Sequence, residues 1–237
     1  MNIINVRIAG VVVEIVTEYR PGISLYQDFR TSEQPDCRIT LTDDDIDFSA
    51  VELNKKAKLL IRTSCVLRKF SEALLPFDAI LMHGTAVGLG NTAYLFTAPS
   101  HTGKTTHARL WMENCSNAYF INGDKTFIRF REDGSILACG SPWAGKENLY
   151  TNTMTPLKSI VLMERAGDNY IRRISFAEAF PILLQQTYQP AEEEKMRKTL
   201  HLLQQLNPTV SFWRFECNNF KDDCFRTAYN ALVRDWK

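Results

Sequence analysis

Nine consecutive residues, Ala98 to Thr106, combine hydroxyl groups, one glycine and one lysine in the order A-P-S-H-T-G-K-T-T. Phosphate-binding loops have the pattern G-x-x-x-x-G-K-[ST] and lie between a strand and a helix. Gly103, Lys104 and Thr105 match this pattern, and Ala98 stands in place of the first glycine. Backbone N–H groups at a helix start attract phosphate oxygens, the lysine reaches the β- and γ-phosphates, and the hydroxyl after it binds Mg²⁺. The residues therefore predict a loop that binds ATP with Mg²⁺.

The histidine inside this loop stands where related loops often carry a second glycine. If that position needs a positive φ, histidine is one of the tolerated non-glycine residues. We therefore expect a left-handed backbone at His101, with its ring directed outward. Backbone amides form the cradle for the phosphates, so catalysis by this side chain is not favoured. The expected nucleotide-binding residues are Ala98, Pro99, Ser100, His101, Thr102, Gly103, Lys104, Thr105 and Thr106.

A carboxylate and a histidine near the loop are candidates for catalysis. Asp124 follows the apolar stretch 118–122, and a carboxylate at the carboxyl end of a strand lies where α/β proteins place ligand chemistry. His83 follows the apolar stretch 79–82, and it can donate to a phosphate oxygen or share a proton with Asp124. The alternatives are an aspartate that closes a turn and a histidine satisfied by the backbone.

Two further polar groups leave alternatives open. In the segment P-W-A-G-K-E at 142–147, Trp143 can stack on adenine or substrate, and Lys146 can neutralise a transferred phosphate. A packed turn and a solvated lysine are equally favoured. Gln185, Gln186 and Tyr188 can shape a pocket, but polar residues at the end of a helix stopped by the following proline are the preferred interpretation.

Hydrophobic periodicity and turn residues predict an α/β chain. Strands are expected over 11–16, 37–41, 79–82, 93–97, 118–122, 126–131, 136–139, 157–164 and 210–217. Helices are expected over 53–75, 104–113, 176–188, 191–205 and 222–236. A turn at 88–91 is expected to join the strands 79–82 and 93–97, and the acidic run 43–47 is expected to form a solvated turn. We predict one α/β domain over 1–237, with a small β-rich part over 1–50.

The overall composition excludes several classes of protein. Lysine and arginine total 28 against 27 acidic residues, so the net charge of +1 gives no case for nucleic acid or an anionic membrane as partner. Six cysteines without a C-x-x-C pair resemble neither a zinc site nor a disulfide framework. The chain shows no signal peptide and no apolar run of about 20 residues. A cytoplasmic protein is expected.

Three motifs together resemble a known group of P-loop proteins. They are His83-Gly84, one strand upstream of the loop, the G-K-T-T of the loop itself, and Asn122-Gly123-Asp124 after the loop helix. In this combination the chain resembles the HPr kinase/phosphorylase and ATP-dependent phosphoenolpyruvate carboxykinase group, and it looks closest to the small HPr kinase-like proteins. The resemblance covers about residues 81–125. It implies a P-loop fold of this type, with a mixed central sheet and flanking helices.

The resemblance also implies roles for individual residues. Asp124 would lie on the Mg²⁺ or catalytic side of the γ-phosphate, Thr105 would be the other metal ligand, and His83 would lie near the γ-phosphate beside Lys104. Gly123 occupies the place of the first residue of an aspartate pair, so one carboxylate is missing.

The implied activity is transfer of the γ-phosphoryl group of ATP to a hydroxyl, with a serine of a protein or peptide as the favoured acceptor. A small-molecule kinase or carboxykinase-like enzyme is one alternative, and a nucleotide-binding module without catalysis is another. HPr kinases form oligomers, so a homo-oligomer is among the expected partners.

Overall fold

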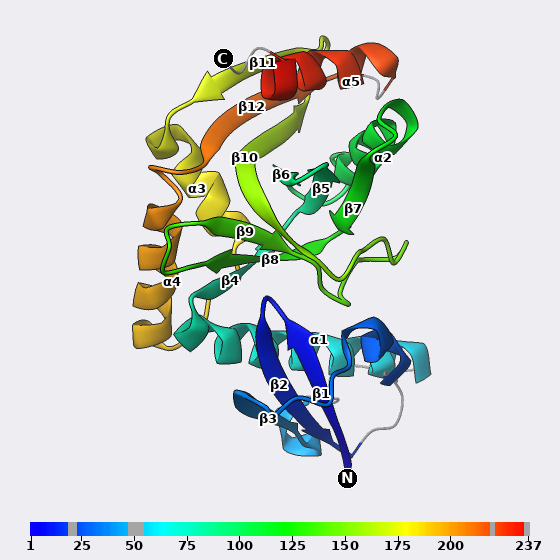
Figure 1. Ribbon diagram of the computed structural model, residues 1–237, viewed down its shortest axis with the longest axis vertical. Helices are drawn as coiled ribbons and strands as arrows, with labels where there is room; N and C mark the ends of the chain where they lie inside the picture. The colour runs from blue at the N-terminus through cyan, green and yellow to red at the C-terminus, as the bar shows by residue number, and fades with distance from the viewer. Residues whose placement is uncertain (19–22, 47–54, 219–220, 235–237) are drawn as a thin grey trace.

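The structure is a computed structural model of the chain, described here for residues 1–18, 23–46, 55–218 and 221–234. It contains two β-sheets, one with three strands and one with nine, and helices pack against both (Figure 1). The larger sheet is mixed, and the helices flank it, so the predicted α/β class with a mixed central sheet is confirmed.

The elements follow the chain in this order. The strands are β1 (Asn2–Ile8), β2 (Val11–Thr17), β3 (Cys37–Leu41), β4 (Ala79–His83), β5 (Thr85–Leu89), β6 (Thr92–Thr97), β7 (Ala118–Asn122), β8 (Lys125–Phe130), β9 (Ile136–Cys139), β10 (Met154–Arg165), β11 (Tyr170–Ile174) and β12 (Ser211–Cys217). The helices are α1 (Lys55–Leu74), α2 (Lys104–Asn114), α3 (Phe176–Gln186), α4 (Glu193–Gln205) and α5 (Asp222–Tyr229). Short 3₁₀ turns are η1 (Ile23–Phe29), η2 (Asp43–Asp45) and η3 (Leu75–Phe77), and a π-helical turn η4 (Asn230–Arg234) continues α5.

Strand β10 joins the two halves of the large sheet. Its first residues, Met154 to Pro156, pair antiparallel with β9, and its later residues pair in parallel with β6 on one side and β12 on the other. One half therefore contains β4, β8 and β9, and the other contains β7, β5, β6, β12 and β11. The long yellow-green strand in Figure 1 shows this passage from one half to the other.

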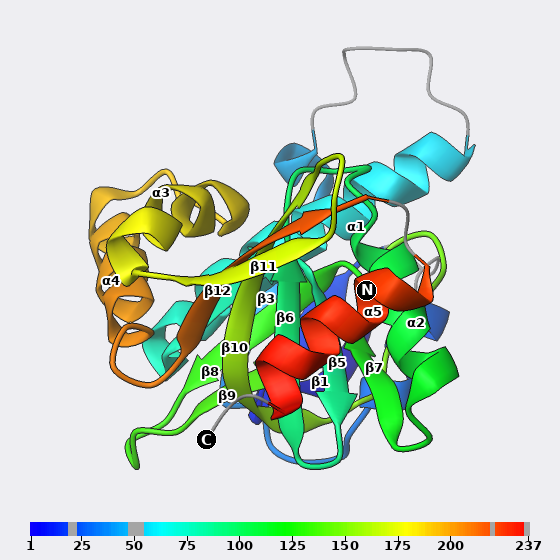
Figure 2. The same ribbon diagram turned by 90° about the horizontal axis from the view of Figure 1, so that it is seen from above.

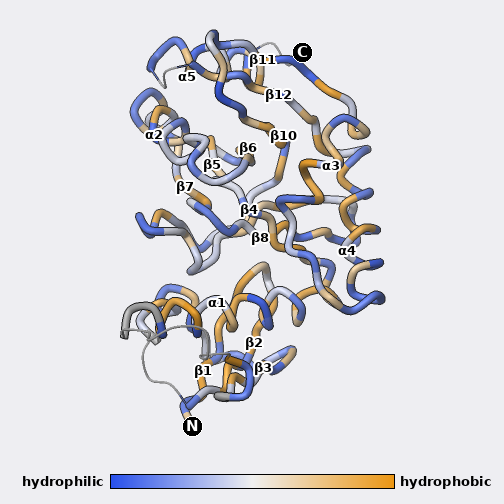
Figure 3. The backbone as a smooth tube through the Cα atoms, turned by 180° about the vertical axis from the view of Figure 1, so that it is seen from behind, coloured by the Kyte–Doolittle hydropathy of each residue, from blue (hydrophilic) through white to orange (hydrophobic). Residues whose placement is uncertain are grey.

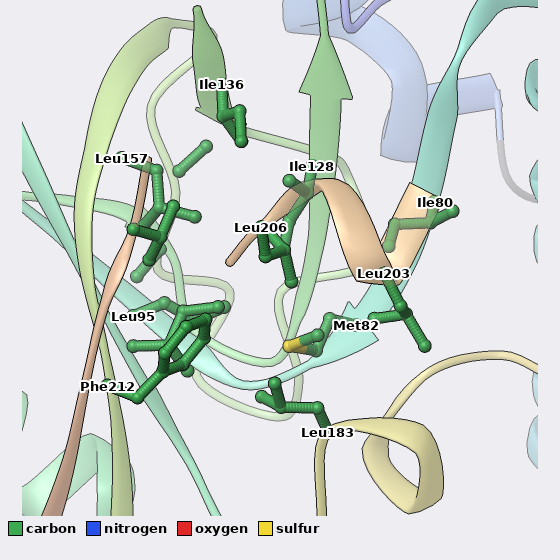
Figure 4. Packing of buried hydrophobic residues seen from close by; sticks show 14 of the residues in the cluster. Ile80, Met82, Leu95, Ile128, Ile136, Leu157, Leu183, Leu203, Leu206 and Phe212 are labelled. Carbon is green, nitrogen blue, oxygen red and sulfur yellow. The ribbon is translucent and has the colours of Figure 1, made fainter. Parts of the chain in front are cut away.

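The half with β4 is buried on both faces, and the alternation along β4 shows why. Ile80 and Met82 point to a core beneath α3 and α4, whereas Ala79 and Leu81 point to a core shared with α1 and the small sheet. Successive side chains of a strand face opposite sides, so a continuous apolar run suits a strand covered twice. Figure 4 shows Ile80 and Met82 meeting Leu183 of α3 and Leu203 of α4.

The helices pack their apolar sides against the sheet. In Figure 3 the hydrophilic side of α4 faces outward, and its hydrophobic side faces the sheet. Helices α2 and α5 cover the other half of the sheet, where Trp111 and Phe225 belong to a third core with Phe96 and Phe215. Helix α2 packs against β5, β6 and β7, and α5 packs against α2 and β11; in Figure 2 α5 crosses in front of β5 and β6.

Most predicted elements are present, but three strands, β1, β5 and β11, were missed. β5 follows β4 directly and pairs with β6, so the turn predicted at 88–91 joins β5 to β6 instead of joining the strands 79–82 and 93–97. The sequence pattern did not indicate this strand, because glycine is uncommon inside strands. Gly88 is accommodated here because the ring of Tyr119, opposite it on β7, occupies the space that a side chain would need. β11, with the sequence Y-I-R-R-I, is an edge strand beside β12.

Some element boundaries differ from those that the sequence predicts. Helix α3 ends at Gln186, two residues before the predicted end, and α4 begins at Glu193, not at 191. Asp43 to Asp45 form a 3₁₀ turn, as expected for the acidic run, whereas Asp47 and the predicted ends Leu53 and Trp236 lie outside the described residues. The division into one domain with a β-rich part over 1–50 stays a prediction. No helix in the described part of the chain has the length and apolar run that crossing a bilayer requires.

Candidate functional site

The segment 98–103 forms a loop between β6 and α2, as the motif requires. Gly103 has a φ of 109° at the start of α2, a backbone region that L side chains rarely adopt. His101 has a φ of 65° and an exposed side chain, so the predicted left-handed backbone at this histidine is confirmed. Ala98 is not among the described residues with a positive φ and is only 1% exposed, packing in the core beneath α2. Its methyl group therefore replaces the first glycine without strain.

Lys104 is buried at the first turn of α2. Its side chain is 7% exposed, and its Nζ donates to the carbonyl oxygens of Ala98 at 2.9 Å and Pro99 at 3.1 Å. Burial lowers the pKa of the Lys104 ammonium; the Asp124 carboxylate partly opposes this shift and Lys125 adds to it. The lysine charge is thus held at the loop, within the electrostatic influence of Asp124.

His83 and Asp124 lie side by side, although 41 positions separate them in the sequence. His83 Nε2 is 3.2 Å from Asp124 Oδ1, and Lys125 Nζ donates to Asp124 Oδ2 at 3.0 Å. Burial raises the pKa of the Asp124 carboxyl, but the hydrogen bond from His83 and the charge and hydrogen bond of Lys125 outweigh it and hold the pKa below its usual range. The carboxylate is ionised at neutral pH, and its side chain remains 32% exposed.

The strands and one buried amide fix this geometry. His83 lies opposite Lys125 in the antiparallel pair of β4 and β8. Asn122, which is fully buried, accepts from the N–H groups of Asp124 and Lys125 through its Oδ1, at 2.8 and 2.7 Å. Thr97, the last residue before the loop, donates its hydroxyl to the carbonyl of His83 at 2.7 Å. The loop, the histidine and the carboxylate are therefore held together by the same hydrogen-bond network.

Gln186 belongs to this site, and the preferred sequence interpretation missed it. It is 9% exposed at the end of α3, and its Oε1 lies 3.0 Å from His83 Nδ1. The two ring nitrogens of His83 thus have two different oxygen partners, Asp124 at Nε2 and Gln186 at Nδ1. Gln186 is therefore placed to hold the His83 ring in its orientation toward Asp124.

The missing carboxylate at Gly123 has a steric explanation. A Cβ at this position would lie 2.8 Å from the carbonyl oxygen of Ala144 and 3.3 Å from that of Leu149. Both contacts come from the segment 142–150, which passes directly over Gly123. The same segment closes against Asp124, because a Cβ at Gly145 would lie 3.1 Å from Asp124 Cβ. An aspartate at 123 requires this segment to move.

The two candidate ligands in that segment have different positions. Trp143 is 7% exposed and packs against Tyr26, Phe70 and Phe127, while its Nε1 donates to the carbonyl of Thr63 at 3.2 Å. The ring fills the core between α1 and the sheet, so the structure favours the packed-turn alternative, and the suggested stacking on adenine is wrong. Lys146 is exposed, and its proposed role toward phosphate stays a prediction.

The hard oxygen groups available for a metal are few. Among the described residues, no group of three or more histidine, cysteine, aspartate or glutamate side chains could hold an ion. Mg²⁺ in nucleotide sites is commonly bound by one or two protein oxygens, with substrate phosphates and water completing the octahedron. The Thr105 hydroxyl at the start of α2 and the ionised Asp124 carboxylate fit that donor set.

Two cavities adjoin the site. One of about 350 Å³ lies outside the loop, between Pro99 to Thr102 and the end of β10. There Arg165 donates to the carbonyl of His101 at 3.0 Å and so supports the left-handed residue. The other, of about 280 Å³, adjoins His83. A larger cavity of about 840 Å³, between the small sheet and the β8–β9 turn, contains none of the predicted site residues.

Comparisons with known proteins give little further information. No family model matches the sequence, and no curated protein matches it. Among solved structures, the HPr(Ser) kinase/phosphatase of Coxiella burnetii is similar to this chain, with a TM-score of 0.39 and 10% identity over 64% of this chain and 95% of that chain. This likeness is too weak to carry an argument about activity.

Proposed function

We propose that this chain is a P-loop phosphotransferase that moves the γ-phosphoryl group of MgATP to a hydroxyl, with a serine of a protein or peptide as acceptor. The observation that carries the proposal is the 3.2 Å approach of His83 Nε2 to Asp124 Oδ1, beside a loop that holds Lys104 at its helix start. Loop, histidine and carboxylate come from three different strand ends. Phosphoryl transfer needs mainly this kind of positioning and charge.

Each group has a role in the proposed reaction. The loop amides and Lys104 bind the β- and γ-phosphates, and the cavity outside the loop leaves room for the nucleoside. Thr105 and Asp124 would hold Mg²⁺, which would supply positive charge to the phosphates. Asp124 takes the proton of the acceptor hydroxyl as the new O–P bond forms, and ADP leaves with the electrons of the broken P–O bond. The His83 ring donates to a γ-phosphate oxygen or keeps Asp124 oriented.

A nucleotide-binding module without catalysis is the second candidate, and two features of the site favour it. Lys125 and His83 both hold the Asp124 carboxylate, and the segment 142–150 excludes a second carboxylate at Gly123. In that case MgATP binds, but no hydroxyl receives its γ-phosphoryl group.

Nucleotide binding is the first step to test. Lys104→Met removes the charge but keeps most of the side-chain length, and we expect it to weaken MgATP binding by roughly 10- to 100-fold, as the loss of a charged hydrogen bond would. The control is Lys198→Met, which removes a partly exposed lysine of α4 that pairs with Asp78. Equilibrium binding of a fluorescent ATP analogue measures both, and circular dichroism checks their folding. Equal affinity of Lys104→Met and wild type would overturn the assignment of the loop.

A further inference from the structure

The cavity beside His83 lies between α1 and the end of α3. It contains His83 and Lys125 of the candidate site but none of the loop residues 98–106. A ligand here therefore contacts the catalytic side of Asp124 without occupying the place of the phosphates. The walls are formed by Ser64, Leu67 and Arg68 of α1 and by Gln185, Gln186 and Tyr188.

The two permanently charged side chains of this cavity are both cationic. Arg68 and Lys125 line it, and no carboxylate does. The nearby Glu72 is held by the Tyr188 hydroxyl and by Lys195 Nζ, both at 2.7 Å. Lys125 is bound to Asp124, whereas Arg68 is exposed and forms no ion pair with another described residue. Its charge acts on the nearby Glu72 carboxyl without a direct ion pair, so the exposed guanidinium can bind a negative charge of the ligand.

The apolar groups extend beyond the cavity along α1. Leu67 and Leu81 form part of its wall, and Leu60, one turn before Ser64, has 61% of its surface exposed. Positions 60, 64, 67 and 68 share one face of the helix, because they are spaced by three, four and eight residues. Eight residues of helix span about 12 Å. This face is long enough for several residues of an extended polypeptide, whereas a small metabolite would need only the cavity.

We propose that this cavity and the face of α1 beside it form the acceptor site, and that the acceptor is a polypeptide segment with an acidic side chain close to the reacting serine. The proposal rests on the proposed phosphotransferase function and specifies its acceptor. The serine hydroxyl approaches Asp124 and His83, the acidic side chain pairs with Arg68, and an apolar side chain beyond it covers Leu60. Charge complementarity and the length of the exposed face carry the assignment.

Three synthetic peptides test it. Each is eight residues long, blocked at both ends and fluorescently labelled, with one serine and one leucine. They differ only in the two residues beside the serine, which are aspartate, asparagine or lysine. Binding is measured by fluorescence anisotropy without ATP. We expect the aspartate peptide to bind at least about 10 times more tightly than the lysine peptide, and this ratio to fall as salt screens the charges.

Charge reversal on α1 provides the decisive comparison. Arg68→Glu should lower the preference for the aspartate peptide by about 10-fold or more, whereas the control Arg197→Glu, at an exposed position of α4, should leave it unchanged. Leu60→Ser should weaken all three peptides to a similar degree. A preference that is the same in wild type and Arg68→Glu, or no binding of any peptide, would overturn the acceptor site.

Adding MgATP separates this proposal from the phosphotransferase function. Preferential binding of the aspartate peptide, lost in Arg68→Glu but without phosphate transfer, would support the acceptor site and contradict the phosphotransferase activity. Transfer to all three peptides at equal rates would support the phosphotransferase activity and contradict the acceptor site. Transfer that favours the aspartate peptide and loses this preference in Arg68→Glu supports both.

Discussion

Gly123 and Asp124 are neighbours with opposite surroundings. The carbonyl oxygens of Ala144 and Leu149 close over Gly123, whereas the Asp124 carboxylate remains partly open and meets His83 and Lys125. A single carboxylate is therefore the arrangement that this backbone accommodates. We attribute both proton transfer and metal binding to Asp124 for this reason.

Gly123→Ala should destabilise the protein by about 1–3 kcal/mol, because its methyl group would press on the backbone of the segment 142–150. Gly167→Ala is the control, since a Cβ at that position has no neighbour within 4 Å and the glycine has no positive φ. Urea denaturation monitored by tryptophan fluorescence measures both. Equal midpoints for the two variants would show that the segment 142–150 can move at little energetic cost and that the steric explanation is wrong.

Sequence reasoning at the residue scale succeeded where the cause was local. The left-handed backbone of His101 follows from its place in a short loop, and the structure has it. Gln186 lies 103 positions from its partner His83, so no local pattern could join them; its only signal was a polar side chain at the end of an apolar helix. Trp143 was ambiguous because an aromatic ring suits both a core and a ligand.

At the scale of elements, Glu72 connects α1 to the chain around α3 and α4. It accepts hydrogen bonds from the Tyr188 hydroxyl, just after α3, and from Lys195 in α4. Burial raises the pKa of the Glu72 carboxyl, but these two hydrogen bonds and the charges of Lys195 and Arg68 outweigh it and lower the pKa below its usual range. The contact holds α1 against the end of α3, which is where the proposed acceptor site lies.

Glu72→Gln should reduce the free energy of unfolding by about 1–2 kcal/mol at neutral pH. A carboxyl with a lowered pKa in the folded state stabilises that state above its unfolded pKa, about 4.3, and loses this contribution as the pH falls through the folded pKa. The difference between wild type and variant should therefore shrink as the pH falls below about 4. Thermal unfolding between pH 3 and 7 measures it.

The control for this variant is Glu192→Gln, which removes the other, 67% exposed carboxylate bound to Lys195. Its effect should stay within about 0.5 kcal/mol, as is usual for exposed ion pairs. A Glu72→Gln effect that is constant from pH 3 to 7 would contradict a role for the carboxylate charge.

The elements that the sequence predicted correctly are those with an uninterrupted apolar pattern. β10 contains the buried run Ile160 to Met163, β12 contains the buried Phe212 and Phe215, and α4 repeats at helical spacing. β5 contains Gly88 and follows β4 after a single residue, so only its pairing partners β6 and β7 define it. Such tertiary pairing is absent from a local pattern.

For the whole molecule, the site lies where the two halves of the large sheet meet. His83 ends β4 in one half, and the loop 98–103 follows β6 in the other. Three buried threonine hydroxyls connect this region: Thr85 donates to the carbonyl of Gly123, Thr97 to that of His83 and Thr126 to that of Gly84. The fold thus holds the proposed nucleotide-binding loop in one half and the proposed acceptor site beside the other, with Asp124 between them.

The measurement that tests this account most directly is transfer of label from γ-labelled ATP, with Mg²⁺, to the serine of the aspartate peptide. Wild type should transfer the label, whereas Asp124→Asn should still bind MgATP but transfer at least about 100-fold more slowly, since a general base contributes about 10²–10⁴ in rate. Transfer by Asp124→Asn at the wild-type rate would contradict the role of the carboxylate. Tight binding of ATP by wild type without transfer to this or any other hydroxyl acceptor would contradict the proposed function.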